Sequence, residues 1–206
     1  MANLGLVHKA LYTAVIPFFT LAMLTKCDTP TEFLSVFLYS LSSMMCFGIS
    51  SRYHIGPWNA EQKAMMGKMD NIGIFFYMTF NASPVFLVLI PEVGIPTLCF
   101  MTLPCIFSAV LVLLTDLGNN RYLMSLYYWL FAAIILLFII PAFAEAATKA
   151  QMIMWLISAA SYVIGGLIYT FKWPDIYPDT LGFHVIFHWF TGLAAIFSST
   201  VNYMVL

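Results

Sequence analysis

The chain has 206 residues, of which 62% are hydrophobic and only 8% are charged, whereas a soluble domain carries roughly 25% charged residues. This composition excludes an ordinary water-soluble globular protein. The net charge of −1 also argues against a nucleic-acid partner, because such surfaces are strongly basic. The expected partner is the lipid bilayer.

Apolar segments separated by short polar loops follow one another along the whole chain. A helix of about 20 mostly apolar residues crosses the hydrocarbon core of a bilayer. The pattern predicts seven such spans, at residues 10–25, 33–53, 69–90, 93–115, 122–143, 150–171 and 183–205. No loop is long enough to form a domain. We therefore expect an all-α, multi-pass integral membrane protein whose residues 1–206 form a single seven-helix domain.

The basic residues are distributed unequally between the two sides of the predicted bundle. Six lie on the side of the amino terminus and two on the other side; they are Lys9, Arg52, Lys63, Lys68, Arg121 and Lys172 against Lys26 and Lys149. Cytoplasmic loops carry an excess of lysine and arginine. This bias predicts that the amino terminus is cytoplasmic.

Histidines mark two of the predicted spans. His54 ends the second span, and Ser50 lies one helical turn before it. His184 and His188 open the seventh span with i, i+4 spacing, which places both imidazoles on one helix face. Polar groups of this kind are costly inside a membrane and are therefore functional candidates. The fourth histidine, His8, lies near the amino terminus and is expected to be solvated.

Asp70 stands at the start of the third predicted span. The second span ends, and the third and seventh begin, on the same side of the bilayer, so His54, Asp70, His184 and His188 reach matching depth. Three imidazoles suit zinc, which then keeps a fourth position for water. Asp70 would hold that water and shuttle its proton. Alternatively, these residues are polar helix ends that bind backbone and lipid headgroups; we favour the metal site.

The order of these motifs along the chain is similar to that of a known protein family. Residues 49–54 (ISSRYH) carry an SxxxH segment, and residues 69–74 (MDNIGI) carry an aspartate at the start of a span. Residues 165–169 (GGLIY), Pro174 and residues 183–188 (FHVIFH) form a final helix pair, in which the last helix opens with the closing HxxxH. Over nearly its whole length the chain resembles the hemolysin III branch of the progestin and adipoQ receptor family.

The resemblance implies a seven-helix bundle with its amino terminus inside the cell. It also implies a zinc ion near the inner leaflet, held by the positions that match His54, His184 and His188. Asp70 would contact that zinc through water, and Ser50 matches the serine beside the site.

The chain departs from the commoner hemolysin III pattern at two positions. Asn71 stands where a histidine often follows the aspartate, and Val185 where a glutamate often follows the first histidine of HxxxH. These two changes affect the groups that surround the metal ligands, and they affect which substrate is preferred. The related alkaline ceramidases share the Ser, His, Asp and HxxxH pattern, but with fewer than the fifteen residues that separate His54 from Asp70 here. The hemolysin III branch therefore fits better.

The resemblance favours a zinc-dependent hydrolase of lipid amides or esters such as ceramide. Asp70 would act as general base, and Ser50 would lie near the developing oxyanion. A second interpretation is a receptor or signalling protein in which zinc only ties helix ends together. A third, a pore former, is disfavoured because apolar spans line an aqueous pore poorly.

Overall fold

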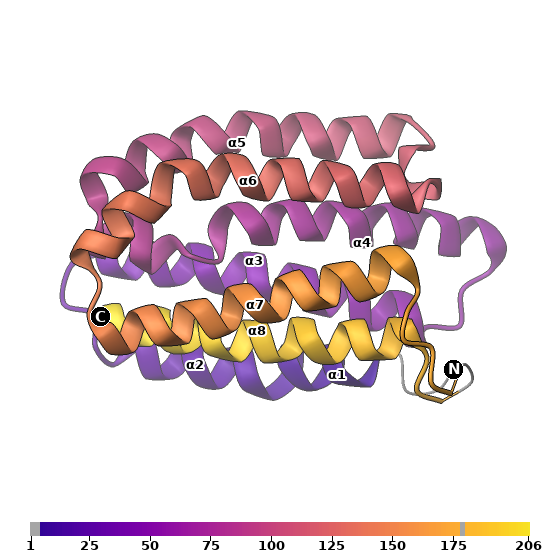
Figure 1. The fold of residues 1–206 in the computed structure, drawn as a ribbon, viewed down its shortest axis with the longest axis horizontal. Helices are drawn as coiled ribbons and strands as arrows, with labels where there is room; N and C mark the ends of the chain where they lie inside the picture. The colour runs from indigo at the N-terminus through magenta and orange to yellow at the C-terminus, as the bar shows by residue number, and fades with distance from the viewer. Residues whose placement is uncertain (1–4, 178–179) are drawn as a thin grey trace.

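The computed structural model describes residues 5–177 and 180–206 as a bundle of roughly parallel and antiparallel helices (Figure 1). Seven helical segments in the described part of the chain are long and apolar enough to cross a membrane: Leu6–Leu24, Pro30–Ile55, Ala60–Leu89, Pro91–Leu114, Arg121–Ala146, Lys149–Phe171 and Phe183–Val205. This result confirms the prediction of an all-α, seven-span protein.

Two spans are interrupted helices. The first consists of α1 (Leu6–Ala10), the π-helical η1 (Leu11–Val15) and α2 (Ile16–Leu24), and the third of α4 (Ala60–Phe80) and the π-helical η2 (Val85–Leu89). The remaining elements are α3 (Pro30–Ile55), α5 (Pro91–Leu114), the short 3-10 helix η3 (Leu117–Asn119), α6 (Arg121–Ala146), α7 (Lys149–Phe171) and α8 (Phe183–Val205).

The third span begins at Ala60, earlier than the predicted residue 69. Asn59 and Gln62 form a capping box, in which each side chain accepts a hydrogen bond from the other residue's backbone N–H. Such a box starts a helix without any help from apolar residues. Asp70 consequently lies about three turns inside α4, and its placement at the start of the span was wrong.

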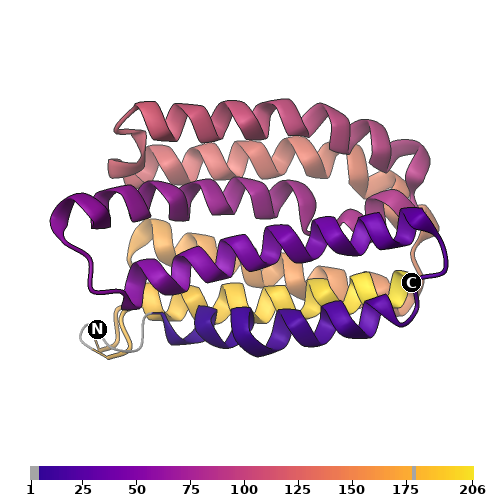
Figure 2. The same ribbon diagram turned by 180° about the vertical axis from the view of Figure 1, so that it is seen from behind.

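The last helix contacts both its neighbour in the chain and spans from the first half of the chain. α8 packs against α7, where the Ser158 hydroxyl donates to the Ala194 carbonyl over 2.9 Å. It also meets α3, where the Tyr39 and Ser199 hydroxyls are 2.7 Å apart. Figures 1 and 2 show α8 beside the first span, with α4, α5 and α6 on the far side of α3 and α7. The ends of α3 and α8 can therefore present side chains to one another.

The third span is interrupted between α4 and η2, and this break is hydrogen-bonded to α8. Pro84 has no N–H to donate to the Phe80 carbonyl, and the Ser83 hydroxyl donates to it instead. One residue along the chain, the Asn81 carbonyl accepts a 2.7 Å hydrogen bond from Asn202 Nδ2 on α8. The side chain of Asn202 is thus used to satisfy a carbonyl that the interrupted helix leaves free.

We predict that Asn202→Ala lowers the free energy of unfolding by about 1 to 2 kcal/mol, because the Asn81 carbonyl loses its donor in an apolar surrounding. Unfolding in mixed detergent micelles measures the change. Thr200→Ala is the control, since the Thr200 hydroxyl is exposed and bonds only to its own helix at Ile196. Equal losses in the two variants would contradict this role of Asn202.

Candidate metal centre

Three histidines converge at one end of the bundle. One potential ligand atom each from His54, His184 and His188 lies within 4.8 Å of the other two. The ring centroids of His54 are 5.1 Å from His184 and 4.9 Å from His188, and those of His184 and His188 are 4.9 Å apart. His188 is buried and the other two are half-buried. The structure thus brings together the three imidazoles that the sequence placed at matching depth.

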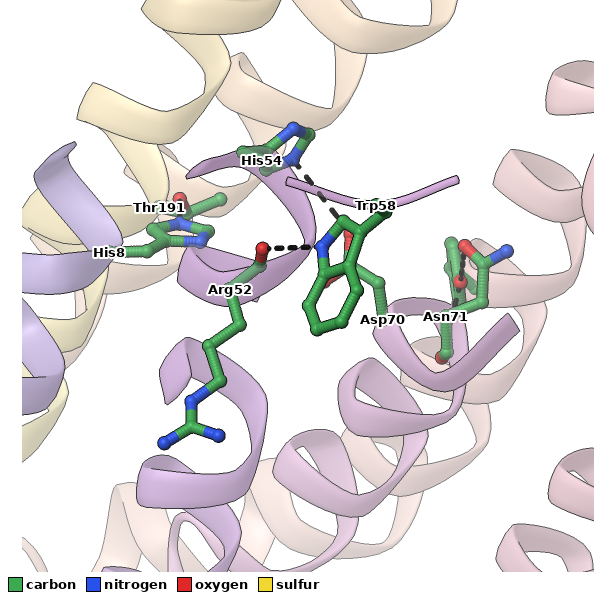
Figure 3. A network of polar contacts seen from close by, with 8 residues as sticks. His8, Arg52, His54, Trp58, Asp70, Asn71 and Thr191 are labelled. Atoms are coloured by element: carbon green, nitrogen blue, oxygen red, sulfur yellow. Dashed lines mark hydrogen bonds and ion pairs between the residues drawn. The ribbon is translucent and has the colours of Figure 1, made fainter. Parts of the chain in front are cut away.

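The ends of two helices set the positions of these rings. α3 stops just after His54, where the Trp58 indole and the Gly56 N–H both donate to the Arg52 carbonyl over 2.8 Å (Figure 3). α8 starts just before His184, where the Asp175 carboxylate accepts a 2.9 Å hydrogen bond from the Phe183 N–H. Each histidine therefore projects from the terminal turns of a helix, and one backbone group at each of these termini has an additional partner.

Asp70 and Ser50 lie beside the three histidines. The Asp70 Oδ2 atom is 3.9 Å from His54 Nε2 (Figure 3). Ser50, one turn before His54 on α3, is buried and lies next to the Asp70 carboxyl in the wall of the same cavity. Asn71, by contrast, is engaged with α6, because its amide oxygen accepts a 3.0 Å hydrogen bond from the Tyr128 hydroxyl.

His8 is not solvated, and that prediction was wrong. Its side chain is buried, with 6% of the residue exposed. Its ring stacks on His188 at a centroid distance of 3.9 Å, and its Nε2 lies 3.1 Å from Thr191 Oγ1 (Figure 3). The cause is the packing of α1 against both α3 and α8. The only signal in the sequence was that His8 lies two residues before the first predicted span.

The donor set fits a divalent metal ion. The Nε2 atom of His54 is buried and has no hydrogen-bond partner, which is costly unless a ligand occupies it. Three imidazole nitrogens from two helices form a set that borderline ions such as zinc accept, with a position left open for water or substrate. The cluster can therefore hold a metal ion, with Asp70 in reach of the open side.

A cavity of about 550 Å³ extends from the cluster into the bundle. Asp70 and His188 line one part of it, and Asn202 lines another. On α8, His188 and Asn202 are fourteen residues, or about 21 Å, apart. The hydroxyls of Tyr77 and Tyr162, which are hydrogen-bonded over 2.7 Å, also line it. The remaining lining is mostly apolar, so the space suits a long hydrocarbon chain with a polar end at the histidines.

Two large apolar residues of the cavity wall are also exposed. Leu136 on α6 and Val163 on α7 are 36% and 43% exposed, whereas Ile135 and Ser158, which line the same cavity from the same helices, are buried. Both exposed residues lie near the middle of their spans. We infer that the cavity opens sideways between α6 and α7, toward the hydrocarbon region of the bilayer.

The comparisons with known proteins agree with this description. A search of solved structures finds no match to the chain. The sequence profile of a family described as haemolysin-III related matches residues 5–199, which include the three histidines of the cluster, Ser50 and Asp70. The chain therefore belongs to the haemolysin III-related family of integral, multi-pass membrane proteins.

Proposed function

We propose that this protein is a zinc-dependent hydrolase of lipid amides or esters, with ceramide as a representative substrate. The observation that carries the proposal is the continuity between the three-histidine cluster and the long apolar cavity. A lipid chain in that cavity would present its polar linkage to the cluster. A zinc that only holds helices together needs no such space.

Each residue of the site has a task in this proposal. His54, His184 and His188 would hold the ion, which supplies an acidified water and polarises a carbonyl. The Asp70 carboxylate binds the attacking water and accepts its proton. The Ser50 hydroxyl donates a hydrogen bond to the carbonyl oxygen as negative charge develops there. The apolar walls bind the acyl chain and keep bulk water out.

The proposal also includes an orientation. The cluster lies at the end of the bundle where α3 ends and α8 begins, which is the side that carries six of the eight basic residues. The positive-inside rule places this end at the cytoplasmic leaflet. The lipid linkage would then be cleaved close to the inner headgroup region.

A lipid screen tests the proposed activity. Purified protein in nanodiscs is stripped of metal, reconstituted with zinc, and given a panel of long-chain amides and esters, with released fatty acid measured by mass spectrometry. We expect release only by the zinc-loaded protein. If fully loaded protein cleaves no member of the panel, and metal removal only lowers its melting temperature, the receptor interpretation is favoured instead.

The proposed sideways opening predicts that Leu136→Trp slows lipid turnover about tenfold, which corresponds to about 1.4 kcal/mol of activation free energy. The larger side chain would narrow the passage between α6 and α7 without reaching the histidines. Leu137→Trp is the matched control, because Leu137 is 76% exposed and does not line the cavity. Both variants should keep their zinc. Equal turnover by the two variants would show that substrate uses another route.

A further inference from the structure

We propose that His8 is a positioning residue of the metal centre, which packs on the His188 ring in the metal-free protein and supplies the acceptor for its second nitrogen when metal binds. This inference rests on the proposed metal site and adds to it a residue from the first span. His8 is not one of the three residues whose ligand atoms meet. It lies behind His188, where its ring and that of His188 are stacked at an interplanar angle of 30°.

The hydrogen bonds of Thr191 favour one tautomer of His8. The Thr191 hydroxyl donates its only proton to the His188 carbonyl over 3.0 Å. With its proton on that carbonyl, the hydroxyl accepts from His8 Nε2, which lies 3.1 Å away and carries a proton in this arrangement. In a neutral His8 ring the proton is then on Nε2, and the Nδ1 atom carries a lone pair. That Nδ1 atom is buried and has no hydrogen-bond partner.

The Nδ1 atom of His188 is also buried and unpartnered. A histidine that binds a metal through Nε2 carries its proton on Nδ1, and such ligands almost always donate that N–H to an acceptor. The stacked neighbour of His188 has a free acceptor of the required kind. A turn of the His188 ring out of the stack when metal binds would direct its Nδ1–H toward the His8 Nδ1 lone pair. Two buried atoms that otherwise have no partner would then satisfy each other.

His8 is well placed for this task because side chains of two neighbouring helices fix it. Phe47 on α3 meets the ring edge to face at a centroid distance of 5.1 Å, while His188 and Thr191 hold it from α8. The π-helical segment η1 follows within one turn. A π turn with one extra residue rotates the preceding helix by about 100° relative to an unbroken α-helix. The face that α1 presents to α8 therefore depends on η1.

Zinc affinity of three variants, measured by chelator competition, tests the inference. His8→Phe keeps an aromatic ring for stacking but removes the acceptor, and His8→Ala removes both. We expect zinc binding to weaken about 10-fold to 100-fold in each, with partial recovery in His8→Asn, whose amide oxygen is an acceptor. Phe18→Leu is the control, because it shrinks an aromatic side chain of the same span that is 67% exposed and does not line the cavity. Its affinity should equal that of the wild type.

A second measurement does not depend on how the variants fold. Nitrogen-15 spectra of wild-type protein with labelled histidine report which ring nitrogen of each histidine is protonated. We expect His8 to be protonated on Nε2 and, in the zinc-loaded protein, His188 on Nδ1. A proton on His8 Nδ1, or wild-type zinc affinity in a folded His8→Phe variant, would overturn the role of His8. Failure of the wild type itself to bind zinc would instead refute the metal site on which the inference rests.

Discussion

Protein carrying His188→Ala is expected to lose its zinc and to release no fatty acid from lipid amides or esters. His188 is 1% exposed and provides one of three converging nitrogens. Two half-buried imidazoles remain. The zinc affinity should fall by more than about 100-fold, because loss of a ligand costs more than loss of a group that only supports a ligand. Chelator competition measures the affinity, and fatty acid release measures the activity.

The control for this variant separates loss of metal from loss of stability. Ser199→Ala, on the same helix, removes a buried hydroxyl that is hydrogen-bonded to Tyr39. It should reduce stability by about 1 kcal/mol and leave zinc affinity unchanged. Zinc bound to folded His188→Ala with wild-type affinity would contradict the assignment of this histidine as a ligand.

Asp70→Asn should separate catalysis from metal binding. The carboxyl lies 3.9 Å from His54 Nε2 and outside the group of three converging ligand atoms. An amide of the same shape can still hold a water but cannot accept its proton. We therefore expect turnover to fall about 10²-fold to 10⁴-fold, the usual contribution of a general base, while about one zinc per chain remains. Turnover and metal content are measured on the same preparation.

Glu61→Gln is the matched control for this change. Glu61 is on the same helix as Asp70, is exposed and does not line the cavity. The same chemical substitution there should leave turnover unaltered. Wild-type turnover by Asp70→Asn would refute the proposed base, and loss of zinc from that variant would show that Asp70 holds the metal rather than the water.

The number and approximate extent of the spans could be predicted because hydrocarbon thickness fixes the length of an apolar helix. The start of the third span could not, because hydropathy does not register a helix that begins in polar sequence. The capping box of Asn59 and Gln62 extends α4 ahead of its apolar part. The same extension moved Asp70 from the beginning of a helix into its third turn.

The meeting of His54 with His184 and His188 was predictable from the order of the spans, which puts all three on one side of the membrane. Sequence alone did not show that α3 and α8 touch there. The burial of His8 was beyond such reasoning, because it depends on how α1 packs against α8. A helical wheel of constant period also cannot follow the π-helical turn at Leu11–Val15. The link between Asn202 and Asn81 likewise joins residues far apart in the chain.

X-ray absorption at the zinc edge of purified, metal-replete protein tests the central claim most directly, because it reports both the identity of the metal and its ligands. We predict about one zinc per chain, with imidazole nitrogens at about 2.0–2.1 Å and no sulfur ligand. The His54→Ala variant should lose this signal. A replete preparation without a zinc edge, or zinc bound to sulfur at about 2.3 Å, would contradict the assignment of His54, His184 and His188 as the metal centre.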